Sequence, residues 1–118
     1  MTHYMNLRPQ PFSMIALGEK TVELRLLDEK RKQISTGDTL VFTSTDDSEA
    51  RISCTVAALH VFSDFSELYR ALPLEKCGYR PDELATASPQ DMEAYYPPEK
   101  QKCYGVVGIE LRDVKKLR

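Results

Sequence analysis

Four side chains with different hydrogen-bonding chemistry lie within six residues of one another near the start of the chain: Lys20, Thr21, Glu23 and Arg25. A lysine can donate to a phosphate or a carbonyl oxygen. An arginine pairs with a phosphate or a base edge, and a glutamate accepts from an exocyclic amine. A strand that only faces water does not need so many of these groups together. We therefore predict a pocket wall that binds a polar, anionic or base-like ligand.

Each of these residues also has a structural interpretation. Glu23 and Arg25 stand two residues apart, on one face of a strand, where they can form a salt bridge that orients the wall. Lys20 can lie along the surface at a strand end, and Thr21 can bond to backbone instead of ligand. The two interpretations are compatible, because an ion pair can preorganise a binding site.

Catalysis in the same place is the alternative hypothesis. A desolvated Lys20 could act as a general base, with Glu23 as its carboxylate partner. The histidines are His3 and His60, and we expect His60 in the core or at a sheet edge, so a ribonuclease with paired histidines is hard to build. A lysine–tyrosine–carboxylate arrangement stays open, and so does the question whether the protein is an enzyme.

Further residues extend the predicted site. Arg31 and Lys32 could gather a nucleic-acid backbone electrostatically, although the short run that begins at Lys30 also fits a solvated loop. Tyr96 could stack on an unpaired base. We expect Tyr104 to be mostly structural, as half-buried tyrosines with a wet hydroxyl often are.

Composition limits the class of protein. The chain has 118 residues and a formal net charge of −2, which predicts one domain over residues 1–118 and does not suggest a binder of long nucleic acids. Three widely spaced cysteines without a Cys/His cluster predict no metal or other cofactor and a reducing cytoplasm. No apolar run reaches the roughly 20 residues of a membrane span, so we expect a soluble cytoplasmic protein with no membrane partner.

Periodicity and turn residues give the elements that must position the site. A helix with Phe12 and Ile15 on its apolar face should end at Gly18. Asp64 should cap a second helix, and Ser88 a third. We predict helices over residues 9–17, 64–72 and 88–96, strands over 5–7, 20–26, 39–44, 50–62 and 103–112, a hairpin turn at 46–48 and a turn-rich insertion at 73–87.

The long strand over residues 50–62 predicts the architecture. Its apolar residues change parity near Ala57 and Ala58, which indicates a bulge or bend of the kind that closes sheets into barrels. The chain lacks a βαβ rhythm and a glycine-rich phosphate loop. We predict an α+β fold, a small partly closed mixed β-barrel of about five strands with short flanking helices.

These motifs together resemble the ASCH domain, a PUA-like β-barrel family. The matching pieces are Pro9 to Phe12, the G-x-K-x-x-E-x-R element from Gly18 to Arg25, Gly37 with Asp38, the helix with Phe65 and Leu68, Tyr95 with Tyr96, and the YGVVGI run from Tyr104 to Ile109. They span nearly the whole chain. The resemblance implies RNA binding in a cleft beside the helix that precedes the Lys20 strand.

The resemblance also implies two enzymatic alternatives. Some members look like ribonucleases, and a small branch removes acyl groups from N4-acylcytidine-type nucleosides with a lysine, a threonine and a glutamate. The lysine corresponds to Lys20, but the threonine position falls on Glu23 and the glutamate position near Cys77. The partner we expect is therefore RNA, a nucleotide or a nucleoside, and a peptide-binding module remains a further alternative.

Overall fold

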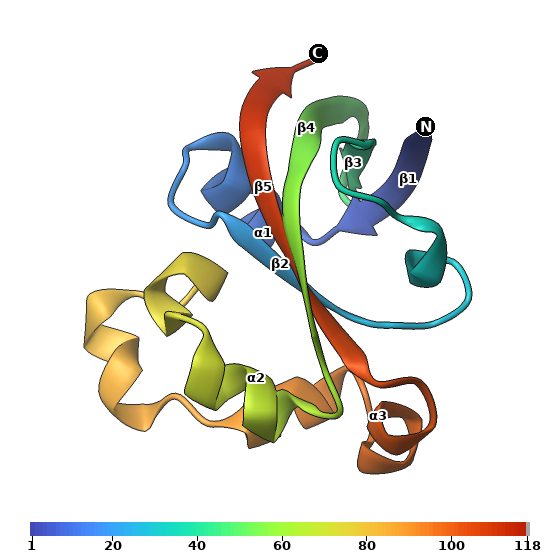
Figure 1. Ribbon diagram of the computed structural model, residues 1–118. Coiled ribbons are helices and arrows are strands. Elements are labelled where there is room, and N and C mark those ends of the chain that lie inside the picture. Colours follow the sequence, from blue (N-terminus) through green and yellow to red (C-terminus); the bar gives the residue numbers. More distant parts are fainter. Residues whose placement is uncertain (118) are drawn as a thin grey trace.

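A computed structural model describes residues 1–117 (Figure 1). Five strands form one mixed sheet in the order β1-β3-β4-β5-β2, and short helices flank it, so the predicted α+β half-barrel is confirmed. The strands are β1 (Thr2–Leu7), β2 (Val22–Leu26), β3 (Thr39–Ser44), β4 (Asp47–Phe62) and β5 (Val106–Lys116). The α-helices are α1 (Pro9–Ala16), α2 (Phe65–Ala71) and α3 (Pro98–Tyr104). The 3-10 helices are η1 (Arg31–Gln33), η2 (Leu74–Cys77), η3 (Pro81–Thr86) and η4 (Pro89–Ala94).

The sheet curls so that its two edge strands approach one another. β1 pairs parallel with β3, whereas the other pairs are antiparallel. Arg25 on β2 donates from Nη2 to the backbone oxygen of Asn6 on β1 at 2.8 Å, which joins the two edges without a strand-to-strand ladder. We call this meeting of Asn6 and Arg25 the seam.

The predicted bend in the long strand is present. The register of β4 against β5 shifts between Val56 and Ala58, and again between Ser53 and Thr55. Each shift places two residues of one strand against fewer of the other, which bends the strand and increases its twist. β4 can therefore pass from the curled end of the sheet to the end that carries α2 (Figure 1).

Two apolar cores lie on opposite sides of this bent sheet. The first gathers around Phe42, Ile52 and Ile109 and includes Ile15 of α1. The second contains Val22, Leu24 and Leu26 of β2 together with Phe65 and Leu68 of α2. The predicted alternation in β2 is thus observed: its apolar residues pack against α2, and the side chains of Glu23 and Arg25 are left for the other face.

The end of the chain differs from the prediction. Residues 103 and 104 were expected to start the last strand, but they end α3, and β5 begins at Val106 and continues to Lys116. Pro97 and Pro98 looked like a helix stop, yet Pro98 is the first residue of α3, where its missing N–H costs little. Gly105, with φ of 74°, then makes the turn into the strand.

Other boundaries also shift. β1 begins at Thr2 rather than Met5, and β3 is followed by a tighter turn, because Asp47 already pairs with Ser44. The predicted helix over residues 88–96 is the 3-10 helix η4, with Ser88 as its N-cap as expected. The 73–87 insertion contains η2 and η3. Asp64 caps α2 by accepting from the backbone N–H of Glu67 at 2.9 Å.

Candidate functional site

A cavity of about 410 Å³ opens between α1, β2 and the segment from α2 to η4. We call it the first cavity. Its wall contains the predicted residues Lys20, Glu23, Arg25 and Tyr96. Thr21 is not on this wall; its backbone N–H donates to the backbone oxygen of Lys76 at 2.9 Å. The structure therefore brings most of the predicted wall residues together, and their role in binding remains a prediction.

The centre of the wall is an ion triad. The buried Glu23 carboxylate, 5% exposed, accepts from Lys20 Nζ at 2.9 Å through one oxygen and from Arg25 Nε at 2.7 Å through the other. The Lys20 and Arg25 side chains are only 12% and 13% exposed. Three charged groups are thus held in one fixed arrangement, which is the preorganisation that recognition of a polar ligand requires.

Burial and charge oppose one another in this triad. Burial alone would raise the pKa of Glu23, but the Lys20 and Arg25 charges and their hydrogen bonds outweigh it and hold that pKa below its ordinary value. Burial alone would lower the pKa of Arg25, but Glu23 raises it. Glu23 is therefore a carboxylate at neutral pH, and Arg25 a cation.

Local backbone structure explains where Lys20 points. Beyond α1, Gly18 takes a positive φ of 78°, and the backbone N–H groups of Glu19 and Lys20 both donate to the Met14 oxygen. Gly78, with φ of 110°, lies against the lysine stem: a Cβ there would sit 3.2 Å from Lys20 Cδ. A glycine at position 78 thus leaves room for the buried lysine.

Tyrosines form the opposite side of the first cavity. Tyr69 and Tyr79 join their hydroxyls at 2.8 Å, and Tyr79 donates to Asp91 Oδ2 at 2.6 Å. Because Tyr79 donates its single hydroxyl proton to Asp91, Tyr69 must be the donor in the bond between the two tyrosines. The ring of Tyr96 stacks on Phe65 with centroids 5.9 Å apart.

The rim of the cavity carries an exposed cation–π pair. The Tyr95 side chain is 51% exposed, and the Arg8 guanidinium lies 4.8 Å from the centre of its ring. Both residues line the first cavity. A stacked cation on an aromatic ring is a flat polar surface on which a base can lie.

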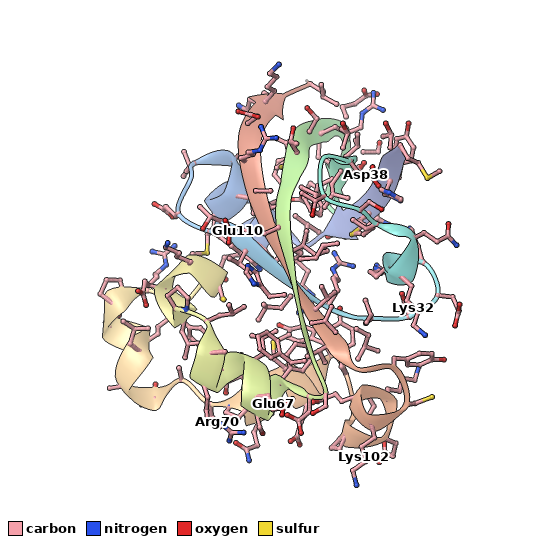
Figure 2. All side chains as sticks on the ribbon, viewed as in Figure 1. Lys32, Asp38, Glu67, Arg70, Lys102 and Glu110 are labelled. Carbon is pink, nitrogen blue, oxygen red and sulfur yellow. The ribbon has the colours of Figure 1, made fainter. Side chains whose placement is uncertain are left out.

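The two predicted phosphate contacts have different surroundings. Arg31 lies on η1 and pairs with Asp28 at 3.1 Å, and its side chain is 16% exposed. Lys32 is half exposed and stands 3.7 Å from Glu29 Oε1, pointing away from the sheet (Figure 2). Neither residue lines the first cavity.

Sequence reasoning missed several wall residues. Tyr69 reaches the cavity from α2, and Tyr79 and Asp91 reach it because the segment from η2 to η4 folds back over β2. Tyr79 falls in the 73–87 segment, which was predicted only as an insertion, whereas Tyr69 and Asp91 fall in two predicted helices, where no local pattern marks them as site residues. Cys77 also lines the wall; burial raises its pKa to about 11, so its thiol stays protonated at neutral pH.

Within residues 1–117, no three His, Cys, Asp or Glu side chains group so that they could hold a metal ion. None of the helices in that part is both long enough and apolar enough to span a membrane.

Fold and site together define a small half-barrel domain with a polar, partly aromatic cavity at the seam. The family model for the ASCH domain matches residues 5–115, so the chain belongs to the ASCH domain family, as its motifs predicted. No match was found among curated proteins.

Solved structures agree with this assignment. The crystal structure of the hypothetical protein PH0355 is 31% identical, with a TM-score of 0.76 and 95% of this chain and 98% of that chain covered. The solution structure of protein PF0455 from Pyrococcus furiosus is also 31% identical, with a TM-score of 0.66 and coverage of 100% and 99%. The crystal structure of ASCH from Zymomonas mobilis shares the fold at 17% identity, with a TM-score of 0.68 and coverage of 98% and 69%.

Proposed function

We propose that this ASCH domain binds a nucleotide or nucleoside unit of RNA in the first cavity. The observation that carries the proposal is the Lys20–Glu23–Arg25 triad, fixed by ion pairs of 2.9 and 2.7 Å on the cavity wall. The family resemblance, which implies RNA binding beside the helix before Lys20, points the same way. RNA recognition commonly places unstacked bases in such polar, aromatic-lined sites.

The charges on the wall favour a base over a bare anion. The cations Arg8, Lys20 and Arg25 are matched there by the acids Glu23, Glu83 and Asp91. A wall with both signs offers donors and acceptors in about equal measure, which suits the edge of a nucleobase. A volume of about 410 Å³ falls within the usual range of small-molecule sites.

The roles we assign follow from the contacts. Lys20 and Arg25 donate to ligand oxygens, and Glu23 holds both cations in place. The rings of Tyr95 and Tyr96 offer stacking surfaces. We place Thr21 behind the wall as a backbone support for Lys20, and we expect Lys32 to add only a long-range attraction for the RNA backbone.

Catalysis in the first cavity is the second candidate, and the buried lysine favours it. Lys20 is fixed beside a carboxylate and could polarise a carbonyl or phosphoryl oxygen. The acyl-removing chemistry that the resemblance implies needs a threonine and a glutamate, whereas Glu23 and Cys77 line the wall here. A ribonuclease that uses Lys20 with Tyr69 or Tyr79 remains compatible with the wall.

One experiment separates these candidates. Short single-stranded RNAs and a panel of nucleosides that includes N4-acetylcytidine are titrated by calorimetry at low and moderate salt, and each mixture is then analysed by mass spectrometry. A binder should return every ligand intact and lose about tenfold or more in affinity with Lys20→Met, because one charge-assisted hydrogen bond contributes about 1.5–3 kcal/mol. An enzyme should lose turnover with that variant and keep much of its affinity.

Two further variants make the result decisive. Lys102→Met removes a cation from an exposed position on α3 that does not line the first cavity (Figure 2), and it should leave ligand affinity unchanged. Tyr95→Ala should weaken base binding about tenfold without threatening the fold, because this ring is exposed. Binding of these ligands that is insensitive to salt and to both Lys20→Met and Tyr95→Ala would place them outside the first cavity and overturn the proposal.

A further inference from the structure

A second, polar cavity of about 340 Å³ lies on the other side of the seam. It shares Asn6 and Arg25 with the first cavity and is otherwise lined by residues of β1, β3 and the η1 region, including Lys30 and Arg31. Arg25 therefore stands between the two cavities. The two cavities therefore adjoin one another at the seam.

The charges of the two walls are different. Among the described residues, the charged side chains that line the second cavity are Arg25, Lys30 and Arg31, with no carboxylate among them. Glu23 and Asp28 lie behind two of these cations and pair with them. The balanced wall of the first cavity thus gives way to a purely cationic one.

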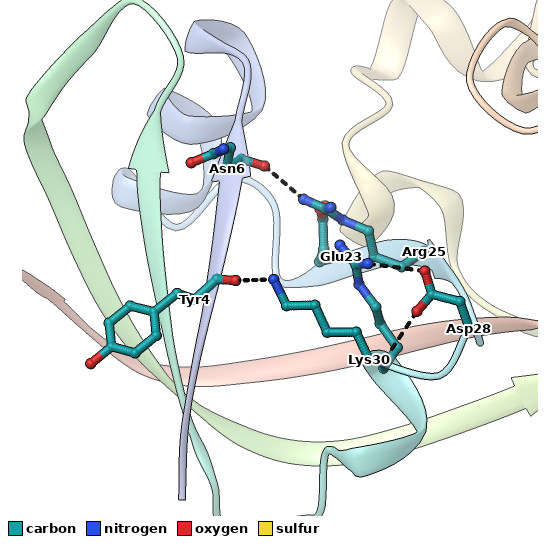
Figure 3. Close-up of polar contacts among 7 residues, drawn as sticks. Tyr4, Asn6, Glu23, Arg25, Asp28 and Lys30 are labelled. Atoms are coloured by element: carbon teal, nitrogen blue, oxygen red, sulfur yellow. Dashed lines mark hydrogen bonds and ion pairs between the residues drawn. The ribbon is translucent and has the colours of Figure 1, made fainter.

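Lys30 has no carboxylate partner within residues 1–117. Its Nζ donates to the backbone oxygen of Tyr4 at 2.6 Å (Figure 3). That neutral acceptor leaves the full positive charge of the ammonium group and two of its three protons available. Lys30 is exposed, so the charge is accessible to a ligand.

Arg31 keeps a donor without a partner. Its Nη1 pairs with Asp28 Oδ2 at 3.1 Å, but its Nε is buried and makes no hydrogen bond in the described part of the chain. An unpaired buried donor of a charged group is costly. Because Arg31 Nε is covered, an oxyanion can bond to it only after the Arg31 side chain turns within the second cavity. The oxyanion would then supply the hydrogen-bond partner that the guanidinium fork lacks.

From these observations we infer that the second cavity is a phosphate site, and that the ligand is a nucleotide whose base occupies the first cavity and whose phosphate lies against Lys30, Arg31 and Arg25. The inference rests on the proposed function and narrows it. Free nucleosides would fill only half of the site. Arg25 would contact the ligand near the join between sugar and phosphate, which explains why it is anchored on both sides, to Glu23 and to Asn6.

The test compares each ribonucleoside with its own 5′- and 3′-monophosphates by calorimetry in 50–300 mM salt. At low salt at least one monophosphate should bind about tenfold or more tightly than its nucleoside, since each charge-assisted contact to phosphate contributes about 1.5–3 kcal/mol. The advantage should shrink as salt is added. Lys30→Gln should abolish most of it and leave nucleoside affinity unchanged.

Matched variants guard the interpretation. Lys102→Gln makes the same change of charge at an exposed position that lines neither cavity and should keep the full advantage. Arg31→Lys keeps the charge but removes the guanidinium fork, and this variant should lose part of the affinity advantage of the monophosphate. Amide chemical shifts of residues 30, 31 and 43 should move with the monophosphate and not with the nucleoside.

The outcomes distinguish the two proposals. Nucleosides and monophosphates that bind equally well would overturn the phosphate site and leave the proposed function standing. A phosphate advantage that survives Lys30→Gln would place the phosphate elsewhere and also overturn it. If neither compound binds to the wild-type protein, the proposed function itself fails.

Discussion

Replacing Glu23 with glutamine should destabilise the fold by about 3 kcal/mol, because it removes the carboxylate that two mostly buried cations share. Breaking a buried ion pair by deleting one partner costs about 3–5 kcal/mol. We expect the lower end of that range. Lys20 and Arg25 line a cavity that water can enter, and the amide oxygen of glutamine still accepts one hydrogen bond.

Urea unfolding at pH 7, followed by circular dichroism, measures this loss. With an m-value of about 1.5 kcal/mol/M, the midpoint should fall by about 2 M. Glu29→Gln is the matched control, since Glu29 is 86% exposed and lies 3.7 Å from Lys32; it should cost less than about 0.5 kcal/mol. If Glu23→Gln cost no more than the control, the triad would be no stronger than a surface pair and our reasoning would fail.

The pH dependence gives a second readout of the same variant. The folded pKa of Glu23 lies below its ordinary value of 4.5. Its stabilising contribution is therefore complete above about that pH and is lost as the pH falls further, through the folded pKa. The difference in unfolding free energy between wild type and Glu23→Gln should stay constant from pH 7 to about 5 and narrow below it. A difference that widens on acidification would contradict the direction of the shift.

Three other predictions follow from groups outside the triad. Hydrogen bonds hold the pKa of Asp38 near 2, so the wild type should lose part of its unfolding free energy as the pH falls from about 3.8 to 2. Asp38→Asn should lack this pH-dependent part, as urea midpoints would show. Gln101 is buried and joins two backbone groups at 3.2 and 2.9 Å, so Gln101→Leu should lower the unfolding free energy by about 2 kcal/mol. Burial raises the pKa of Cys54 to about 12 and of Cys77 to about 11, so a thiol reagent should modify only the exposed Cys103 rapidly in native protein and all three in urea. Rapid native modification of more than one thiol would contradict this.

Local signals in the sequence carried much of the fold. The change of parity in residues 50–62 predicted the bend in β4, because side chains alternate strictly along a strand and can change face only at an irregularity. Asp64 and Ser88 predicted two helix starts for a similarly local reason, since each cap is made within three residues. These features depend on neighbours along the chain, which the sequence displays directly.

Features that depend on distant parts of the chain were not predictable. The start of β1 at Thr2 follows from its parallel pairing with β3, almost forty residues away, where Thr2 lies opposite Thr39. The helix α3 is held in place by Gln101, whose amide oxygen accepts from the backbone of Phe65 on α2. No pattern within residues 97–105 contains that contact, so two prolines were read as an end instead of a beginning.

The same division applies to the candidate site. Lys20, Glu23 and Arg25 were predicted because the triad is made within six residues, whereas Tyr69 and Tyr79 were missed because only folding brings them opposite the triad. Arg31 and Lys32 look alike in the sequence, but only Arg31 lies on the wall of the second cavity. Which of the two reaches the cavity depends on the direction of each side chain on η1, and a run of basic residues in the sequence does not show that direction.

The overall charge of −2 is consistent with a phosphate site of this kind. A binder of long RNA needs cations spread over an extended face, so that many phosphates are neutralised at once. Here the second cavity brings together three cations and no carboxylate, whereas the chain as a whole is slightly acidic. Such an arrangement attracts one or two phosphates at short range and repels a long polyanion elsewhere. It therefore favours a single nucleotide, or the end of an RNA strand, over a continuous RNA track.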